Sequence, residues 1–174
     1  YAAYLVYDSF TGTNGTSLDA HTPEKGGPWV ETIGAWTIQS NKASHPDAGA
    51  GGSNYATVDA SEADVTVQAT IVCGTAPYPG LAIRFDGVSS LLEIHLSPTD
   101  DMIYFLTNNA GSRSLLASAA FVHDSSTAYA FKVVTNGNSV KVYVDDVLYI
   151  DTTTALCQTE TKHGPWLWNA LLQY

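Results

Sequence analysis

The chain has 174 residues, of which 45% are hydrophobic and only 14% are charged, and its 17 Asp and Glu against 7 Lys and Arg give a formal net charge of −10. A chain of this length can bury roughly 70% of the surface that its unfolded form exposes, so we expect residues 1–174 to form one domain with its own core. The negative charge repels phosphate backbones and anionic lipid, and no apolar run approaches the roughly 18 residues of a membrane span, so nucleic acid is excluded as a partner and membrane insertion is not expected.

Short segments of alternating polar and apolar residues follow one another along the chain, and none suits an amphipathic helix of about ten residues. In segment 64–72, Val65, Val67, Ala69 and Ile71 would face a core while the residues between them face solvent. The candidate strands, in chain order, are 5–7, 36–39, 54–58, 64–72, 81–85, 91–96, 103–107, 114–119, 129–135, 140–144, 147–151 and 166–169.

The segment 129–151 contains the clearest hairpin. Alternation with period two runs up to Asn136-Gly137 and resumes at Val140. Because Asn and Gly adopt positive φ at little cost, the pair suits a tight turn whose twist matches the flanking strands.

Turn residues recur about every ten residues, a spacing typical of an all-β sandwich or barrel. The irregular parts are the opening loop 11–28 and the glycine-rich tract 44–53. Since the chain opens on Tyr1 and not on an initiator methionine, we expect a processed protein or a piece of a longer one.

Cys73 and Cys157 are the two cysteines of the chain. A disulfide between them would tie the middle of the chain to its end and constrain a long loop of the unfolded state. Two separate buried thiols are the alternative, because sequence does not show pairing geometry. No Cys or His spacing indicates zinc.

Several motifs resemble one family. The amino-terminal signature of concanavalin A-like (laminin G-like) jelly-roll domains, found in bacterial surface proteins and bacteriophage virion proteins, is similar to Asp8-Ser9-Phe10, Gly15-Thr16-Ser17-Leu18, His21-Thr22-Pro23, Gly26-Gly27, Trp29 and Trp36. Later segments also resemble the family, namely Gly80-Leu81-Ala82-Ile83-Arg84-Phe85, Val142-Tyr143-Val144-Asp145-Asp146-Val147-Leu148 and His163-Gly164-Pro165-Trp166. The resemblance implies a concanavalin A-like jelly-roll β-sandwich of two antiparallel sheets.

The resemblance also implies a structural calcium ion. Such domains often carry one on the convex side, and the candidate ligands here are Asp8 with Asp145, Asp146 or Asp151. Calcium binds several oxygen atoms, which carboxylates supply. We therefore expect a calcium site that includes Asp8, Asp146 and Asp151, although the chain lacks a compact Asp-rich loop.

Two enzymatic readings follow from the same resemblance. Laminarinase-like hydrolases of this fold place carboxylates at alternating positions of one strand, where this chain has Glu93, His95 and Ser97, so the pair of carboxylates is incomplete. Alginate-lyase-like jelly rolls use an Arg, a Gln-x-His strand and a Tyr, to which Arg84, Glu93-Ile94-His95 and Tyr104 are similar. Glu93 would repel the uronate that the family's Gln binds, so catalysis is the weaker hypothesis.

Binding of carbohydrate needs fewer residues. Sugars stack on exposed aromatic rings and hydrogen-bond to polar side chains, and the candidates are Tyr78, Arg84, Glu93, His95 and Tyr104. Tyr78 lies between two prolines in an expected loop. The alternative is structural, because a Glu and a His two positions apart commonly pair on a solvated strand face, and Arg84 would then form an ordinary salt bridge.

Tryptophans complete the aromatic candidates. Trp29 and Trp36 are expected to seal an edge of the sandwich, and Trp166 with Trp168 could contact sugar or a neighbouring subunit.

Three functions therefore remain open. The first is a non-catalytic module that binds carbohydrate or a host-surface glycan, and the second is a structural virion component, such as a decoration or fibre domain, with homo-oligomer or virion neighbours. The third is a lyase or hydrolase. We expect attachment or assembly at an external surface, extracellular or on a virion, and fold resemblance carries most of this expectation.

Overall fold

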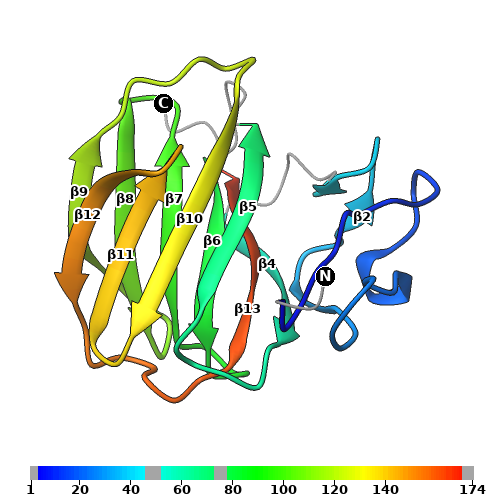
Figure 1. The fold of residues 1–174 in the computed structure, drawn as a ribbon, viewed down its shortest axis with the longest axis horizontal. Helices are drawn as coiled ribbons and strands as arrows, with labels where there is room; N and C mark the ends of the chain where they lie inside the picture. The colour runs from blue at the N-terminus through cyan, green and yellow to red at the C-terminus, as the bar shows by residue number, and fades with distance from the viewer. Residues whose placement is uncertain (1–3, 46–51, 73–77, 170–174) are drawn as a thin grey trace.

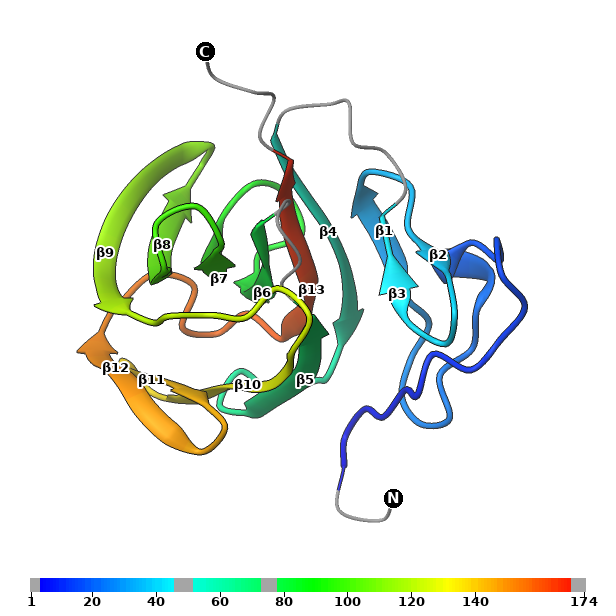
Figure 2. The same ribbon diagram turned by 90° about the horizontal axis from the view of Figure 1, so that it is seen from above.

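Two antiparallel β-sheets lie face to face in the computed structural model of the protein, which describes residues 4–45, 52–72 and 78–169 (Figures 1 and 2). The one helical element among these residues is the 3-10 turn η1 (Leu18–Ala20). No helix in the described part of the chain has the length and apolar character needed to span a membrane. The all-β sandwich predicted from the sequence is confirmed.

The larger sheet has seven strands. Their spatial order is β1 (Val30–Ile33), β4 (Gly52–Asp59), β13 (Lys162–Asn169), β6 (Tyr78–Phe85), β7 (Leu91–Ser97), β8 (Met102–Asn109) and β9 (Ser112–Ala120). Strand β13 enters between β4 and β6 although it is the last strand in sequence. The sheet is curved, and Figure 2 shows β9 on one side and β4 on the other bending away from the second sheet.

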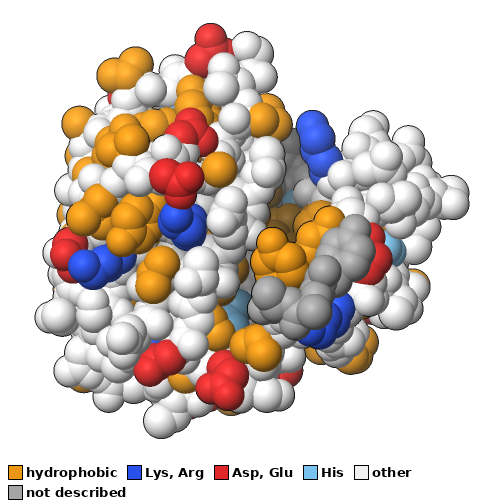
Figure 3. Space-filling view, viewed as in Figure 1, with side chains coloured by type: hydrophobic (Ala, Val, Ile, Leu, Met, Phe, Trp, Pro, Cys, Tyr) orange, Lys and Arg blue, Asp and Glu red, His pale blue; other side chains and the backbone are white. Residues whose placement is uncertain are grey.

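The second sheet has four strands, in the order β12 (Val147–Thr153), β11 (Ser139–Val144), β10 (Ala128–Asn136) and β5 (Thr66–Val72). A small pair, β2 (Thr37–Ile38) and β3 (Ala43–Ser44), lies apart from both sheets. The outer face of the four-stranded sheet, seen in Figure 3, carries basic and acidic side chains beside apolar ones. Its ion pairs include Lys132 with Asp146 and Lys141 with Asp151.

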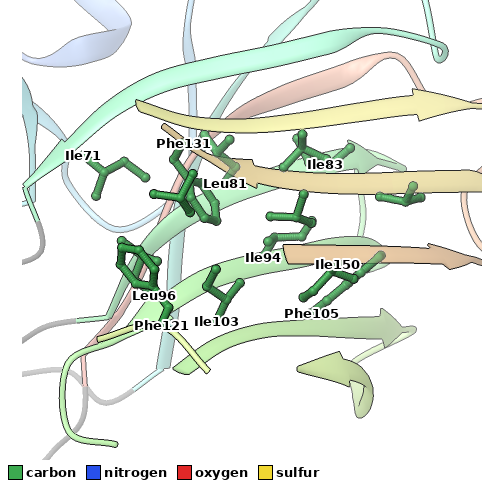
Figure 4. Packing of buried hydrophobic residues seen from close by; sticks show 14 of the residues in the cluster. Ile71, Leu81, Ile83, Ile94, Leu96, Ile103, Phe105, Phe121, Phe131 and Ile150 are labelled. Carbon is green, nitrogen blue, oxygen red and sulfur yellow. The ribbon is translucent and has the colours of Figure 1, made fainter. Parts of the chain in front are cut away.

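The main hydrophobic core fills the space between the two sheets (Figure 4). Every second residue of a strand points into it, as period-two alternation requires. Ile71 is buried there and Val67 and Ala69 pack against it, as the sequence predicted. From the larger sheet, Ile94 and Phe105 enter the same cluster and are fully buried.

Two-residue turns join β10 to β11 and β11 to β12. The hairpin expected between β10 and β11 is confirmed, but its turn is shifted by one residue from Asn136-Gly137: Gly137, with φ of 53°, and Asn138 form the turn, and Asn136 pairs with Ser139. In the next turn Asp145 and Asp146 both have positive φ, 48° and 63°. Asp tolerates this left-handed conformation because its short polar side chain bonds locally, and the Asp145 carboxylate accepts the backbone N–H of Ala130.

The segment before β4 forms a second, smaller core. Trp29 and Trp36 are 6% and 3% exposed and cluster with Leu18 and Ile38 against β4, which confirms their sealing role. The strand expected at 5–7 is wrong, because only an isolated bridge from Tyr7 to Lys25 forms there. The sequence also did not indicate strands β1 and β3.

Candidate functional site

The candidate site lies on the face of the seven-stranded sheet that points away from the core. We call it the concave face, because the sheet curves around it (Figure 2). On β7, Leu92, Ile94 and Leu96 point into the core, so Glu93 and His95 point to the concave face.

Strand register places four residues in one row across this face. Trp166 of β13 pairs with Gly80 of β6, Gly80 pairs with His95 of β7, and His95 pairs with Tyr104 of β8. Because Gly80 has no side chain, the rings of Trp166 and His95 meet above it, with ring centroids 4.8 Å apart and planes inclined by 20°. A Cβ at Gly80 would lie 2.1 Å from the carbonyl oxygen of Ile94.

Two half-buried tyrosines flank the His95 ring. The Tyr78 ring lies 6.0 Å from it in an edge-on arrangement, and the Tyr104 ring lies 5.7 Å away. The Tyr78 hydroxyl is 3.1 Å from the Thr99 hydroxyl, while the Tyr104 hydroxyl donates to the Asp100 carboxylate at 2.5 Å. This hydrogen bond to Asp100 raises the pKa of Tyr104.

His95 is a neutral member of this cluster. It is 7% exposed, and burial, with the nearby positive charge of Arg113, lowers its pKa to about 3. Its Nδ1 has no hydrogen-bond partner among the described residues. At ordinary pH the ring is therefore an uncharged aromatic surface with an unused polar atom.

Beside His95, Glu93 is fully buried and engaged in an ion pair. Its Oε2 accepts from Arg113 Nε at 2.7 Å and lies 2.6 Å from Arg113 Nη2, and its Oε1 accepts from Asn108 Nδ2 at 3.0 Å. The guanidinium carbon of Arg113 also lies 4.2 Å from the centre of the Trp168 ring. The guanidinium of Arg113 thus connects the edge strand β9 to β7 and β13 across the concave face.

Four of the five predicted sugar-binding residues meet here, namely Tyr78, Glu93, His95 and Tyr104. Tyr78 is the first residue of β6, so the prediction that it lies in a loop is wrong.

Arg84 is not part of the site. Its φ of 53° breaks the alternation along β6, and Phe85 instead joins the cluster of Tyr55 and Trp166. The Arg84 guanidinium is fully buried and donates to the carbonyls of Ala63 and Gly137 at 3.0 and 2.9 Å and to Asp64 Oδ1 at 2.7 Å. It therefore ties loops of the sandwich together, and the prediction of a role in sugar binding is wrong.

The arginine of the concave face is Arg113, which the sequence analysis did not select. It is separated by 20 residues from Glu93, and its strand has few charges to mark it. Only the register of β7, β8 and β9 brings the two side chains to the same end of the face.

The three aspartates expected to bind calcium do not come together. Asp8 accepts hydrogen bonds from His21 Nε2, Trp29 Nε1 and the backbone N–H of Phe10. Asp146 and Asp151 pair with lysines of the second sheet, and no group of three metal-ligating side chains occurs in the described ranges. The prediction that these three aspartates form one calcium site is therefore wrong, because each carboxylate is held by different partners.

The expected disulfide stays a prediction. Cys73 lies outside the described residues. Cys157 is a half-buried free thiol, and burial raises its pKa to about 11.

The surroundings of Glu93 do not supply the carboxylate pair of a glycoside hydrolase. Its partners directly across the neighbouring strands are Ala82 and Leu106, and the alternate positions on β7 are Leu91 and His95. A second carboxylate would be required on the same face to protonate or attack a glycosidic bond.

Comparison with known proteins reveals the fold. No protein-family model matches the chain, and no curated protein sequence matches it. Among solved structures, the carbohydrate binding module CBM66 from Bacillus subtilis is 20% identical to this chain, with a TM-score of 0.69. The match covers 81% of this chain and 88% of the CBM66 chain. The β-glucanase of Bacillus licheniformis is 17% identical with a TM-score of 0.55, covering 91% and 86%. The chain therefore has the concanavalin A-like lectin/glucanase jelly-roll fold that its sequence predicts.

Proposed function

We propose that the concave face binds carbohydrate without cleaving it. The observation that carries the proposal is the aromatic cluster, in which half-exposed Tyr78 and Tyr104 stand on either side of the neutral His95 ring. Aromatic rings offer flat apolar surfaces to the C–H faces of sugars, and their polar tips bond hydroxyl groups. The similar fold of a carbohydrate binding module supports the same reading by analogy.

Unused polar atoms around the cluster add support. His95 Nδ1, Trp166 Nε1 and Asn108 Oδ1 are buried and have no hydrogen-bond partner among the described residues. Native proteins satisfy most buried polar groups, so a group of three unpaired atoms on one face needs an explanation. Because these atoms have almost no accessible surface, a ligand rich in hydroxyl groups can bond them only when the side chains that cover them shift.

Turnover is not part of the proposal, because the carboxylate of Glu93, in the middle of the face, is held by Arg113 and Asn108. A general acid must be able to reach the glycosidic oxygen. Glu93 does not meet this requirement, because it is fully buried and both of its carboxylate oxygens already accept hydrogen bonds.

We also propose that binding serves attachment or assembly at an external surface, as part of a secreted protein or of a phage particle. The resemblance of the amino-terminal motifs to such proteins supports this, together with the net charge of −10. A structural calcium ion stays part of the proposal, without assigned ligands.

Affinity electrophoresis tests the proposal. The chain is run through gels that contain neutral or uronic polysaccharides, with and without calcium, and the gels are then stained for loss of polymer. Tyr104→Ala and Tyr78→Ala should abolish retardation, whereas Tyr143→Ala, a half-buried tyrosine on the second sheet, should not. Absence of retardation on every polymer contradicts carbohydrate binding, and cleared zones contradict a non-catalytic role.

A further inference from the structure

A pocket of about 280 Å³ opens between β1, β4, β13 and β6. It is lined by Gly27, Pro28, Val30, Thr32, Thr57, Asp59, Phe85, Gly87 and Lys162. We call it the Lys162 pocket. On β13, Trp168 pairs with Tyr78 at one end of the strand, and Lys162 pairs with Phe85 at the other. The pocket therefore lies at the end of the sheet opposite the cluster of Tyr78, His95 and Tyr104, which we call the tyrosine cluster.

The walls of the pocket are largely apolar. Phe85 is 2% exposed and forms part of its floor, and Val30 is 56% exposed at its side. Pro28 also lines it. A floor of this kind suits the C–H face of a ring and not a strongly hydrated ion.

The polar groups of the pocket form a donor and acceptor pair. Lys162 and Asp59 stand directly opposite each other on paired strands. No carboxylate in the described ranges lies within 4.0 Å of the Lys162 ammonium, so its three N–H groups are free to donate. The Oδ1 of Asp59 accepts from the Thr161 hydroxyl at 2.7 Å and the Ser61 N–H at 2.8 Å, which leaves Oδ2 as an acceptor.

Gly87 keeps space around the ammonium. It has φ of +87°, and a Cβ there would lie 2.8 Å from Lys162 Nζ. The glycine thus meets a backbone requirement and borders the ammonium, which lies at the far end of a flexible side chain.

We propose that the Lys162 pocket binds one neutral glycosyl unit of the carbohydrate that the concave face binds, an inference that rests on the proposed function. Neighbouring hydroxyl groups of a sugar both donate and accept, which matches an ammonium and a carboxylate side by side. The ammonium and the carboxylate balance each other, so the pocket carries no net charge that would select a uronate, and the ligand class is neutral.

Buried aromatic side chains lie between the pocket and the tyrosine cluster. The Tyr55 ring lies 5.1 Å from the Phe85 ring, and Tyr55 pairs with Trp166, whose ring stacks on His95. Asp59 follows Tyr55 by four residues on β4 and therefore faces the same side of the sheet, so the pocket and the tyrosine cluster belong to one face.

Amide chemical shifts of the full chain test the inference. Glucose, galactose, mannose, fructose and glucuronate are each titrated separately, to concentrations of tens of millimolar because one glycosyl unit is expected to bind with Kd of about 1 to 10 mM. At least one neutral sugar should shift amides of the pocket. Lys162→Gln and Asp59→Asn should each weaken that binding about tenfold, while Lys132→Gln, which removes the same charge from the second sheet, should not.

The outcomes separate the two proposals. If no monosaccharide shifts the pocket amides, or if glucuronate alone does, the inference is overturned even where polysaccharide retardation persists. If Lys132→Gln weakens binding as much as Lys162→Gln, charge and not the pocket is responsible, and the inference again fails. If a neutral sugar binds in the pocket while no polysaccharide retards the chain, the pocket stands and binding by the tyrosine cluster falls.

Discussion

The guanidinium of Arg113 holds the carboxylate of Glu93 with 2.6 Å between Nη2 and Oε2, although Arg113 lies on the edge strand and Glu93 in the middle of the sheet. Glu93 is fully buried, and the Arg113 side chain is 26% exposed. The pair therefore forms a unit with no net charge on the concave face.

Removal of Arg113 should destabilise the fold. In Arg113→Met the buried Glu93 loses its counter-charge, and we expect unfolding to become easier by about 3 kcal/mol, as when one partner of a buried pair is removed. Adding Glu93→Gln should recover part of this loss. Urea unfolding of the single and double variants measures both effects, with Lys141→Met, from an exposed pair on the second sheet, as the control. Equal losses in Arg113→Met and the control would contradict the role of the pair.

Stability should fall as the pH is lowered from 6.5. Burial is the main cause that lowers the pKa of His95 to about 3 and that of His163 to about 4. The unfolded chain takes up these protons near pH 6.5 while the folded chain does not, so each histidine costs up to about 1.4 kcal/mol per pH unit below 6.5. Above pH 7.5 both states are neutral and the effect is absent.

The variant His95→Phe isolates one of the two histidines, since phenylalanine keeps a ring beside Trp166. The slope of the unfolding free energy against pH is measured by urea unfolding between pH 5 and 6.5. It should decrease by the contribution of about one proton, which is about 1.4 kcal/mol per pH unit. The slope between pH 7.5 and 8.5 should stay unchanged and serves as the control. An unchanged slope at the lower pH would show that His95 is protonated in the folded state.

Arg84 should matter for stability and not for sugar binding. Arg84→Met removes the group that donates hydrogen bonds to two backbone carbonyls and to the Asp64 carboxylate. We expect the free energy of unfolding to fall by about 3 kcal/mol or more. Thermal unfolding measures the loss, and affinity electrophoresis below the transition should show unchanged retardation. Loss of retardation in a folded Arg84→Met protein would restore the role expected from the sequence.

Gly80 should tolerate no side chain. A Cβ would lie 2.1 Å from the Ile94 carbonyl oxygen and 2.7 Å from His95 Cα, both backbone atoms, so Gly80→Ala should cost about 3 kcal/mol or more by forcing β6 and β7 apart. The matched control is Gly27→Ala, where the nearest atom to the new methyl group is a Val58 methyl at 4.0 Å. Urea unfolding should separate the two, and a loss below about 1 kcal/mol in Gly80→Ala would contradict this account.

The sequence predicted the strands well wherever alternation was regular. The candidate strand 91–96 matches β7 (Leu91–Ser97), and 140–144 matches β11 (Ser139–Val144), because core-facing apolar residues recur at every second position along both, although every residue of β7 is buried. Short β3 (Ala43–Ser44) was missed because two residues show no periodicity. The strand expected at 5–7 failed for the opposite reason, since its alternation has no neighbouring strand beyond the Lys25 bridge.

The site was only half predictable. Glu93 and His95 share a face by simple alternation, and the register then adds Tyr104. Arg84 was misplaced because period-two reasoning assumes extended backbone, and its positive φ breaks that assumption. Arg113 was missed because its contact with Glu93 depends on the register of β7, β8 and β9, which a local pattern does not encode.

The position of β13 also constrains how the protein is made. The strand (Lys162–Asn169) fills the space between β4 and β6, more than 75 residues from either in sequence. While the chain is being synthesised, β4 and β6 therefore have unpaired edges until residue 169 leaves the ribosome. Such edges can pair with other chains, so the nascent protein should depend on fast completion or on chaperones for its yield.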